Sequence, residues 1–296
     1  WFTNLAGQSR ERLGRFNADG SLDSTFTNRV SDPVFAIGLQ QDGKIVVGGS
    51  FTNVGGQSRN GLARLNTDGS LDPAFTNGIS GGGIVRCAAV QPDGKILVGG
   101  AFGTLGGQSR ANLGRLNSDG SLDSTFVNGA NSEVYSIALQ EDGKILVAGL
   151  FTTLAGQPRP GLGRVDPDGT LDMTFSNTVS GGDVLGVTIQ PDGKIVVGGA
   201  FTNVAGQARD RLARLCTADA AFQELTVDPT GTRATWKRGG ASPAVWRTTF
   251  EGSTNGITWS MLGDGVRMSN GWETTGLSLP FDQVAYVRAR GYARGG

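Results

Sequence analysis

Histidine is absent from this sequence of 296 residues. Its absence removes the usual general base near neutral pH, excludes a Ser-His-Asp triad and takes away the commonest protein ligand of zinc and copper. Cysteine is scarce as well. Because Cys87 and Cys216 fall in different strand types of different repeats, we interpret them as two buried thiols and expect no disulfide.

An excess of charge of either sign is also missing. The 26 basic side chains balance the 26 acidic ones, and no basic stripe is visible. Nucleic-acid binders draw most of their affinity from neutralising phosphates, so we expect no nucleic-acid partner. No stretch approaches the roughly 18 apolar residues that cross a bilayer, so we expect no membrane span.

Glycine is abundant, with 49 residues, and much of it recurs in repeats about 50 residues long. The same loop sequence occurs five times. Its copies open near Phe2, Phe51, Phe102, Phe151 and Phe201.

One full copy predicts a four-stranded antiparallel sheet. The first strand, as in VFAIGLQ, ends at an Asp-Gly turn, and the second, IVVGG, is apolar on both faces. The third, GLARLN, ends at another Asp-Gly turn, and LDPAF completes the copy. Since such a sheet must be covered on both faces, the sequence predicts an all-β fold, a β-propeller with blades of about 50 residues around an axis.

The two ends of the chain depart from the repeat. Trp1 stands where a second strand ends in the other copies, so the first blade is incomplete and we expect five or more blades. We expect the ring to close either through a segment outside these residues or by pairing of its two ends. The predicted domains are the propeller repeats, residues 1–217, and a small β-sandwich, residues 218–296, that stops before a seventh strand is evident.

The strings LNTDGSLDPAF, LQEDGKILVAG and FTNVGGQSR resemble the delta-60 repeat β-propeller proteins of bacteria. The glycine pair is similar to that of kelch repeats, without the kelch aromatic signature. Residues 250–280 resemble the fibronectin-type-III-like modules that follow such propellers. These resemblances imply a secreted bacterial protein, located outside the cell or on its surface.

An arginine in the third strand and an aspartate eight positions later recur from blade to blade. We interpret them as structural ion pairs, because a group repeated in every blade is better explained as part of the scaffold than as one active site. The arginines are Arg15, Arg64, Arg115, Arg164 and Arg214, and the aspartates are Asp23, Asp72, Asp123 and Asp172.

The loops between the second and third strands form the candidate binding face, since recognition residues concentrate on scaffold-held loops. Anchoring of the loops is the alternative role for their side chains. The candidates on this face are Gln57, Arg59, Gln108, Arg110, Gln157, Arg159, Gln207 and Arg209. In the sandwich, Tyr286, Arg288 and Arg290 share one face of the last strand and form a second candidate contact surface.

Two further sets of residues carry minor hypotheses. Asp32, Glu133 and Asp183 lie in the loops between blades, where a pair of carboxylates could hydrolyse a glycosidic bond; solvated loop charges are the alternative. Asn66, Asp68 and Asp72 offer oxygen atoms to calcium, although a capped turn explains them as well. We expect no other metal and no cofactor.

The leading prediction is an extracellular module for binding or adhesion, without catalytic activity, whose partner is a polysaccharide or a surface protein. A structural subunit of a bacterial surface layer or fibre, which self-associates, is the second hypothesis. A carboxylate glycosidase is the third.

Overall fold

The computed structural model describes residues 2–80, 82–217, 219–280 and 284–293, and its regular elements are β-strands. Four copies of the repeat form three-stranded antiparallel sheets, which we call blades 1 to 4. The first strand of each turns at Asp-Gly into the second, which pairs with the third. Blade by blade, they are β3 (Val34–Leu39), β4 (Ile45–Gly49) and β7 (Leu62–Leu65); β8 (Ile84–Val90), β9 (Ile96–Ala101) and β12 (Leu113–Leu116); β13 (Val134–Leu139), β14 (Ile145–Gly149) and β17 (Leu162–Val165); β19 (Val184–Ile189), β20 (Ile195–Gly199) and β23 (Leu212–Leu215).

In blades 1 to 3 the predicted fourth strand is reduced to a single bridge, such as that between Leu65 and Leu71 in blade 1. The loop between the second and third strands forms a small hairpin of its own. The loop before each blade pairs with this hairpin, as Val30 does with Val54. The outer strands are β1 (Asn4–Leu5), β2 (Gln8–Ser9), β5 (Asn53–Val54), β6 (Gln57–Ser58), β10 (Thr104–Leu105), β11 (Gln108–Ser109), β15 (Thr153–Leu154), β16 (Gln157–Pro158), β18 (Val179–Ser180), β21 (Asn203–Val204) and β22 (Gln207–Ala208).

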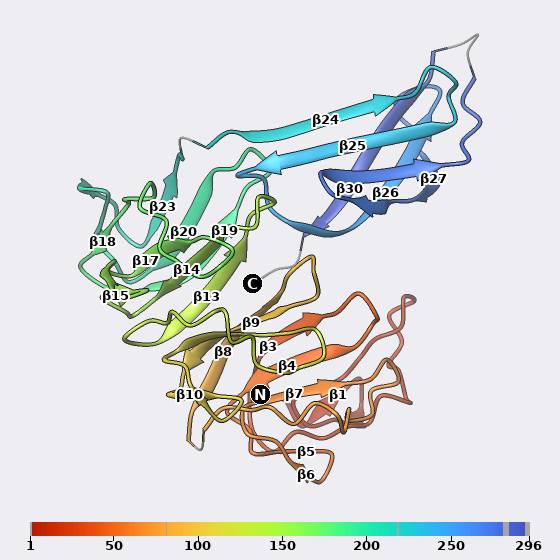
Figure 1. The fold of residues 1–296 in the computed structure, drawn as a ribbon. Helices are drawn as coiled ribbons and strands as arrows, with labels where there is room; N and C mark the ends of the chain where they lie inside the picture. Colours follow the sequence, from red (N-terminus) through yellow and green to blue (C-terminus); the bar gives the residue numbers. More distant parts are fainter. Residues whose placement is uncertain (1, 81, 218, 281–283, 294–296) are drawn as a thin grey trace.

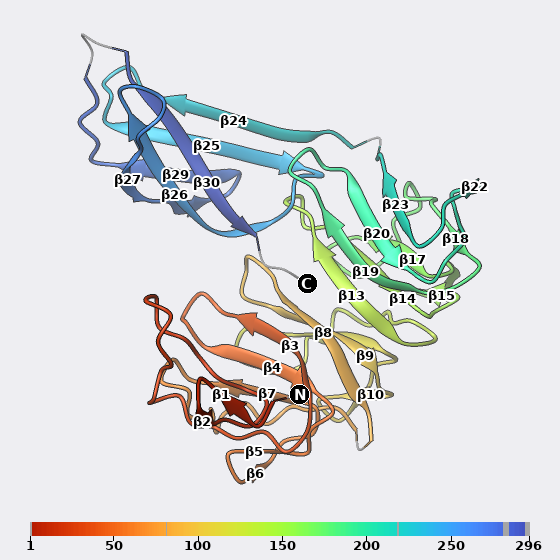
Figure 2. The same ribbon diagram turned by 180° about the vertical axis from the view of Figure 1, so that it is seen from behind.

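The blades stand side by side around an axis, in the order of the sequence (Figures 1 and 2). Apolar side chains from neighbouring blades share clusters, so that Val85 and Val98 of blade 2 pack with Val46 and Leu62 of blade 1. The arc is open: β3 packs on β8, β8 on β13 and β13 on β19, but no comparable packing joins β19 back to β3. The predicted β-propeller therefore has four blades that contain both the first and the second strand, together with the partial copy in residues 2–26.

Residues 221–280 and 284–293 contain two antiparallel sheets that enclose an apolar cluster with Trp236, Phe250 and Trp272. None of the described residues forms a helix that is long and apolar enough to cross a membrane. One sheet contains β24 (Ala221–Val227), β25 (Arg233–Gly240), β29 (Gly271–Thr275) and β28 (Val266–Met268); the other contains β27 (Ser260–Asp264), β26 (Val245–Ser253) and β30 (Tyr286–Ala293).

These two sheets are attached to the turn of blade 3 by a buried carboxylate. Glu141 pairs with Arg267 at 2.6 Å and with Arg238 at 3.3 Å. Burial raises the pKa of Glu141 above its ordinary value, although both arginines act in the opposite direction. Next to it, the backbone N–H of Ala244 donates to the carbonyl of Leu139 at 2.9 Å, so the attachment also has a backbone component.

The two cysteines are free and differ in their surroundings. Cys87 is buried between blades 2 and 3, and burial raises the pKa of its thiol to about 12. Cys216 is exposed, so the prediction of two buried thiols is wrong for this residue. It directly follows β23, on which no further blade packs.

Candidate binding site at the mouth of the blade axis

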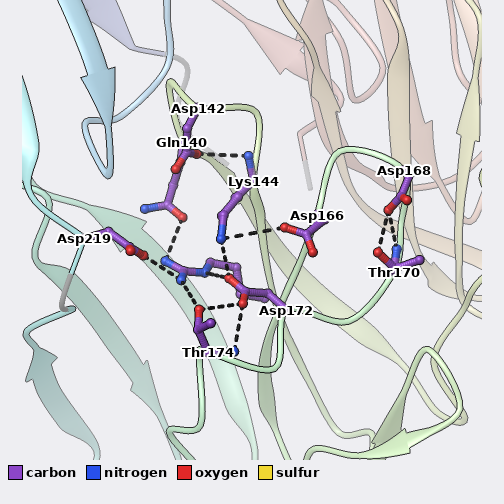
Figure 3. Close-up of polar contacts among 10 residues, drawn as sticks. Gln140, Asp142, Lys144, Asp166, Asp168, Thr170, Asp172, Thr174 and Asp219 are labelled. Atoms are coloured by element: carbon purple, nitrogen blue, oxygen red, sulfur yellow. Dashed lines mark hydrogen bonds and ion pairs between the residues drawn. The ribbon is translucent and has the colours of Figure 1, made fainter.

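The repeated arginine and aspartate side chains form buried ion pairs within the blades, as expected. Figure 3 shows the pair of blade 3, in which Nε of Arg164 lies 2.7 Å from Asp172. Nζ of Lys144 lies 2.7 Å from the same carboxylate, and the hydroxyl of Thr174 donates to it. The matching pairs in the other blades are Arg64 with Asp72, Arg115 with Asp123 and, in the partial copy, Arg15 with Asp23.

Each of these arginines also reaches the next blade. Arg64 donates to the carbonyl of Ser118 at 2.7 Å, and Arg115 donates to that of Pro167 at 2.5 Å. Each guanidinium stacks on a phenylalanine as well, such as Phe75 beneath Arg64. These repeated arginines therefore help to hold one blade to the next. Arg214 is exposed and, among the described residues, has no such carboxylate partner.

The oxygen atoms of the calcium candidates are engaged within the turn and the ion pair. The carboxylate of Asp68 accepts from the backbone and hydroxyl of Ser70, and the amide of Asn66 donates to the same hydroxyl. Asp72 accepts from Arg64 and Lys44, so the three candidates do not converge on one point. Within the described ranges, no group of three or more potential ligands could hold a metal ion.

The arginines and glutamines of the predicted loop face are placed one pair to a blade, in the outer hairpins. The structure therefore does not bring the four pairs together (Figure 1). The glutamine side chains are exposed, and each arginine donates to the carbonyl of the residue before it, at 2.8 Å from Arg59 to Ser58. Each outer hairpin thus presents one small polar group.

The predicted contact surface on the last strand, β30, is partly engaged within its own sheet. Arg288 pairs with Glu251 at 2.5 Å and stacks on Trp259, 4.0 Å from the ring centre. Arg290 lies 3.3 Å from the same glutamate, while Tyr286 is exposed. Only part of this surface is therefore free to contact a partner.

The blades converge at a different place, the start of their first strands around the axis. Phe35, Tyr135 and Leu185 are the second residues of β3, β13 and β19, Arg86 of β8 is their equivalent in the repeat, and all four line one cavity of about 650 Å³. The guanidinium of Arg86 lies 5.4 Å from the ring centre of Phe35 and 5.8 Å from that of Tyr135. We call these four residues the axial mouth. They combine two aromatic faces with a cation at one opening.

Two of the three candidate catalytic carboxylates lie beside the axial mouth. Glu133 pairs with Arg86 at 3.4 Å. Burial raises the pKa of the Tyr135 phenol, and the negative charges of Glu133 and Asp183 raise it further. Asp32 lies in the loop before blade 1 and makes no contact with this group that would complete a catalytic set.

Our reasoning from the sequence did not identify the axial mouth as a site, although a signal for it was present. The repeat changes residue type at this position, from aromatic to cationic to aliphatic, while the Asp-Gly turns stay the same. A position that varies within a near-identical repeat, at the centre of the ring, indicates recognition rather than folding.

The recurring sequence lies in the segments that separate the first strand of one blade from the first strand of the next. They match the family described as "Domain of unknown function (DUF5122) beta-propeller" at residues 1–26, 40–75, 91–126, 140–175 and 190–217, which together make up more than half of the chain. The chain belongs to this family. The ion pairs lie within the segments matched to DUF5122, whereas the axial mouth lies between them.

Solved structures with similar folds include the WD40 domain of Pan2 from Neurospora crassa, at 11% identity and a TM-score of 0.41, covering 77% of this chain and 67% of that one. A gluconolactonase from Xanthomonas campestris matches at 17% identity and a TM-score of 0.38, covering 79% and 77%. PorZ of the type-IX secretion system of Porphyromonas gingivalis matches at 11% identity and 0.38, covering 93% of this chain and 48% of that one. No curated protein matches the sequence.

Proposed function

We propose that this chain is an extracellular binding module without catalytic activity, and that it binds a polysaccharide at the axial mouth. One observation carries the proposal. The arginines and aspartates that recur in the third strands and the segments after them form ion pairs within the scaffold, whereas residues that differ between blades line a common cavity. The family's recurring sequence thus forms the scaffold, and the residues between its segments form the site.

The chemistry of the axial mouth suits a neutral sugar. The rings of Phe35 and Tyr135 offer faces to the C–H side of a pyranose, and Arg86 and Glu133 offer a donor and acceptors to its hydroxyl groups. Because Glu133 neutralises Arg86 and Asp183 adds a further carboxylate nearby, the local charge disfavours polymers of uronic acids.

The same contacts favour binding over hydrolysis. Glu133 is engaged by both Arg86 and Tyr135, and the loops that hold Asp32 and Asp183 belong to blades 1 and 4, at the two ends of the arc. A glycosidase needs two carboxylates on either side of one bond. Nothing in this arrangement assigns an acid and a base to such a pair.

Two finer assignments belong to the same proposal. The repeats are of the delta-60 type, and residues 221–293 are a fibronectin-type-III-like module, as their four-stranded and three-stranded antiparallel sheets suggest. Extracellular placement rests on the resemblance to secreted proteins of that type.

The test is a panel of neutral, amino-sugar and uronic-acid polysaccharides, screened by affinity electrophoresis and followed for release of reducing ends. We expect retardation by at least one neutral polysaccharide with no release of sugar. Sugar release that is lost in Glu133→Gln or Asp183→Asn would establish the glycosidase instead. Retardation by none of the polymers, with capture of a surface protein, would establish a protein partner.

A structural role is the second candidate, favoured by the buried attachment of the C-terminal sheets. The ion pairs of Glu141 fix the orientation of these sheets on blade 3, as a rigid building block requires. Electron microscopy of the purified protein tests this role. Ordered fibres or sheets that form without ligand would favour it, and discrete particles would rule it out.

A further inference from the structure

A second cavity lies at the rim of the blades, where the outer hairpins of blades 1 and 2 meet the loop that joins these two blades. Its volume is about 290 Å³. Hydroxyl, amide and guanidinium groups line it, and its described lining residues include no carboxylate. The polar side chains of the lining are Ser58, Arg59, Asn60, Thr76, Ser80 and Thr104. We call this cavity the hairpin pocket.

The loop that leads into a blade caps the outer hairpin of that blade with a side-chain oxygen in blades 1 and 3. In blade 1, Oγ of Ser31 accepts from the backbone N–H groups of Thr52 and Asn53, both at 3.1 Å. In blade 3, Oδ1 of Asn131 accepts from the two equivalent N–H groups, both at 2.9 Å. Two adjacent N–H groups of each hairpin are thus directed at one oxygen atom.

Blade 2 departs from this arrangement at two positions. The backbone N–H of Ser80 donates to the carbonyl of Thr104 at 3.3 Å, but the hydroxyl of Ser80 makes no hydrogen bond with another described residue. The hairpin also has Gly103 where the others have threonine, and a Cβ atom on Gly103 would meet nothing within 4 Å. The N–H groups of Gly103 and Thr104 therefore lack the side-chain cap, and a bound ligand can supply the oxygen atom in its place.

Arg59 supplies a positive charge to the same pocket. Its Nη1 donates to the carbonyl of Ser58 at 2.8 Å, and this bond fixes one side of the guanidinium. Arg59 forms no ion pair with a carboxylate of the described ranges, whereas Arg86 at the axial mouth is paired with Glu133. A guanidinium and adjacent backbone N–H groups are the donors with which proteins bind sulfate and phosphate groups.

We propose that the hairpin pocket binds a sugar that carries a sulfate or phosphate ester. The ester group takes the position of the capping oxygen on Gly103 and Thr104 and pairs with Arg59. Because about 15 Å³ of such volume is enough for one water molecule, a cavity of about 290 Å³ has room for the sugar as well as its ester. The hydroxyl and amide side chains of the pocket offer hydrogen bonds to the sugar hydroxyls. This site shares no lining residue with the axial mouth.

The test titrates glucose 6-sulfate, glucose 6-phosphate and unmodified glucose into the protein by calorimetry. We expect saturable binding of at least one ester, with an affinity for glucose that is at least tenfold lower. Arg59→Ala should weaken ester binding at least tenfold. Arg110→Ala is the matched control and should bind as the wild type does. Arg110 makes the same bond to the carbonyl before it, at 2.7 Å to Ser109, but the hairpin that follows it is capped by Asn131.

Two further variants restore the arrangement of the other blades. Gly103→Thr returns the threonine of the other hairpins, and Ser80→Asn introduces the capping side chain that blade 3 has in Asn131. Gly103 has no positive φ, so a threonine there is not strained. Both variants should unfold at the temperature of the wild type, and each should weaken ester binding at least tenfold.

Hydrogen exchange supplies an independent readout. On binding of the ester, we expect the backbone amides of Gly103 and Thr104 to become protected. Binding of neither ester at millimolar concentration, equal affinity for glucose and its esters, or affinity that Arg59→Ala leaves unchanged would overturn the proposal. An equal loss in Arg110→Ala would overturn it as well, and inorganic sulfate that binds as tightly as glucose 6-sulfate would overturn the assignment of a sugar.

Discussion

Gly48 of blade 1 lies directly against the side chain of Val85 in blade 2, at a point where the two sheets leave no room for a Cβ atom. The equivalent Gly198 of blade 4 has no neighbouring blade, and its nearest contact for a Cβ is the carbonyl oxygen of Arg211 in its own blade, at 3.8 Å. Glycine at this repeat position is therefore packed against a neighbouring blade in one case and open on that side in the other.

The first prediction concerns these two glycines. Gly48→Val should destabilise the protein by about 1–3 kcal/mol or more, because the added side chain forces blades 1 and 2 apart. Gly198→Val should have little effect, because its surroundings are open. Thermal unfolding followed by circular dichroism measures both variants, and equal losses of stability would show that blade contact is not what the glycine provides.

Gly49, next along the strand, has a separate constraint. A Cβ at this position would meet the carbonyl oxygen of Pro33 in the same blade. The expected failure of a Gly48→Val, Gly49→Val double variant to fold therefore has two causes, one between blades and one within blade 1.

The second prediction concerns the buried ion pair of blade 2. Asp123→Ala leaves the buried guanidinium of Arg115 and the ammonium group of Lys95 without their shared carboxylate. We expect a loss of about 3–5 kcal/mol in the free energy of unfolding, measured with urea. Asp23→Ala is the matched control, because Arg15 is partly exposed and the pair lies in the partial copy. Its effect should be much smaller, and a comparable loss would contradict the importance of burial.

The third prediction is a pH dependence of the same ion pair. Burial of Asp123 opposes ionisation, but hydrogen bonds from Thr125, Lys95 and Arg115 outweigh it and hold the pKa below its ordinary value of 3.8. A carboxyl whose pKa is lower in the folded state than in the unfolded state stabilises the fold at any pH above its unfolded-state pKa. This contribution is lost as the pH falls through the folded-state pKa. The free energy of unfolding should therefore drop below about pH 4. The drop should be shallower in Asp123→Asn, and identical slopes would exclude the pair as its source.

The sequence was sufficient to predict the blades because their determinants are local and repeated. Asp-Gly turns join the strands, glycine pairs occur where blades meet, and each arginine finds its aspartate eight positions on. These interactions recur at fixed spacing, so a single chain displays them several times. The partial first copy was evident for the same reason.

The attachment of the C-terminal sheets could not be predicted in this way. Glu141 occurs once, where the other copies have Gln41, Pro92 and Pro191, and its partners Arg238 and Arg267 are distant in sequence. The exposure of Cys216 escaped prediction because it depends on whether a further blade follows blade 4. Both features depend on contacts that no periodic pattern encodes.

The fourth prediction tests this attachment. Glu141→Ala leaves the buried Arg238 without its carboxylate, so the C-terminal sheets should come away from blade 3 while each part stays folded. Small-angle X-ray scattering should then give a larger radius of gyration. Glu224→Ala, which removes an exposed pair with Lys237, is the control and should leave the radius unchanged. An unchanged radius in Glu141→Ala would show that the backbone contacts suffice.

Binding at the axial mouth is tested most directly by titrating the neutral polysaccharide retained in the screen against the wild type, Arg86→Ala and Arg59→Ala by calorimetry. Arg86 lies between the two rings of the mouth, whereas Arg59 belongs to an outer hairpin. We predict that Arg86→Ala weakens binding at least tenfold, a loss of about 1.4 kcal/mol, and that Arg59→Ala binds as the wild type does. Equal affinities of Arg86→Ala and the wild type, or a loss confined to Arg59→Ala, would contradict binding at the mouth and assign it to the outer hairpins.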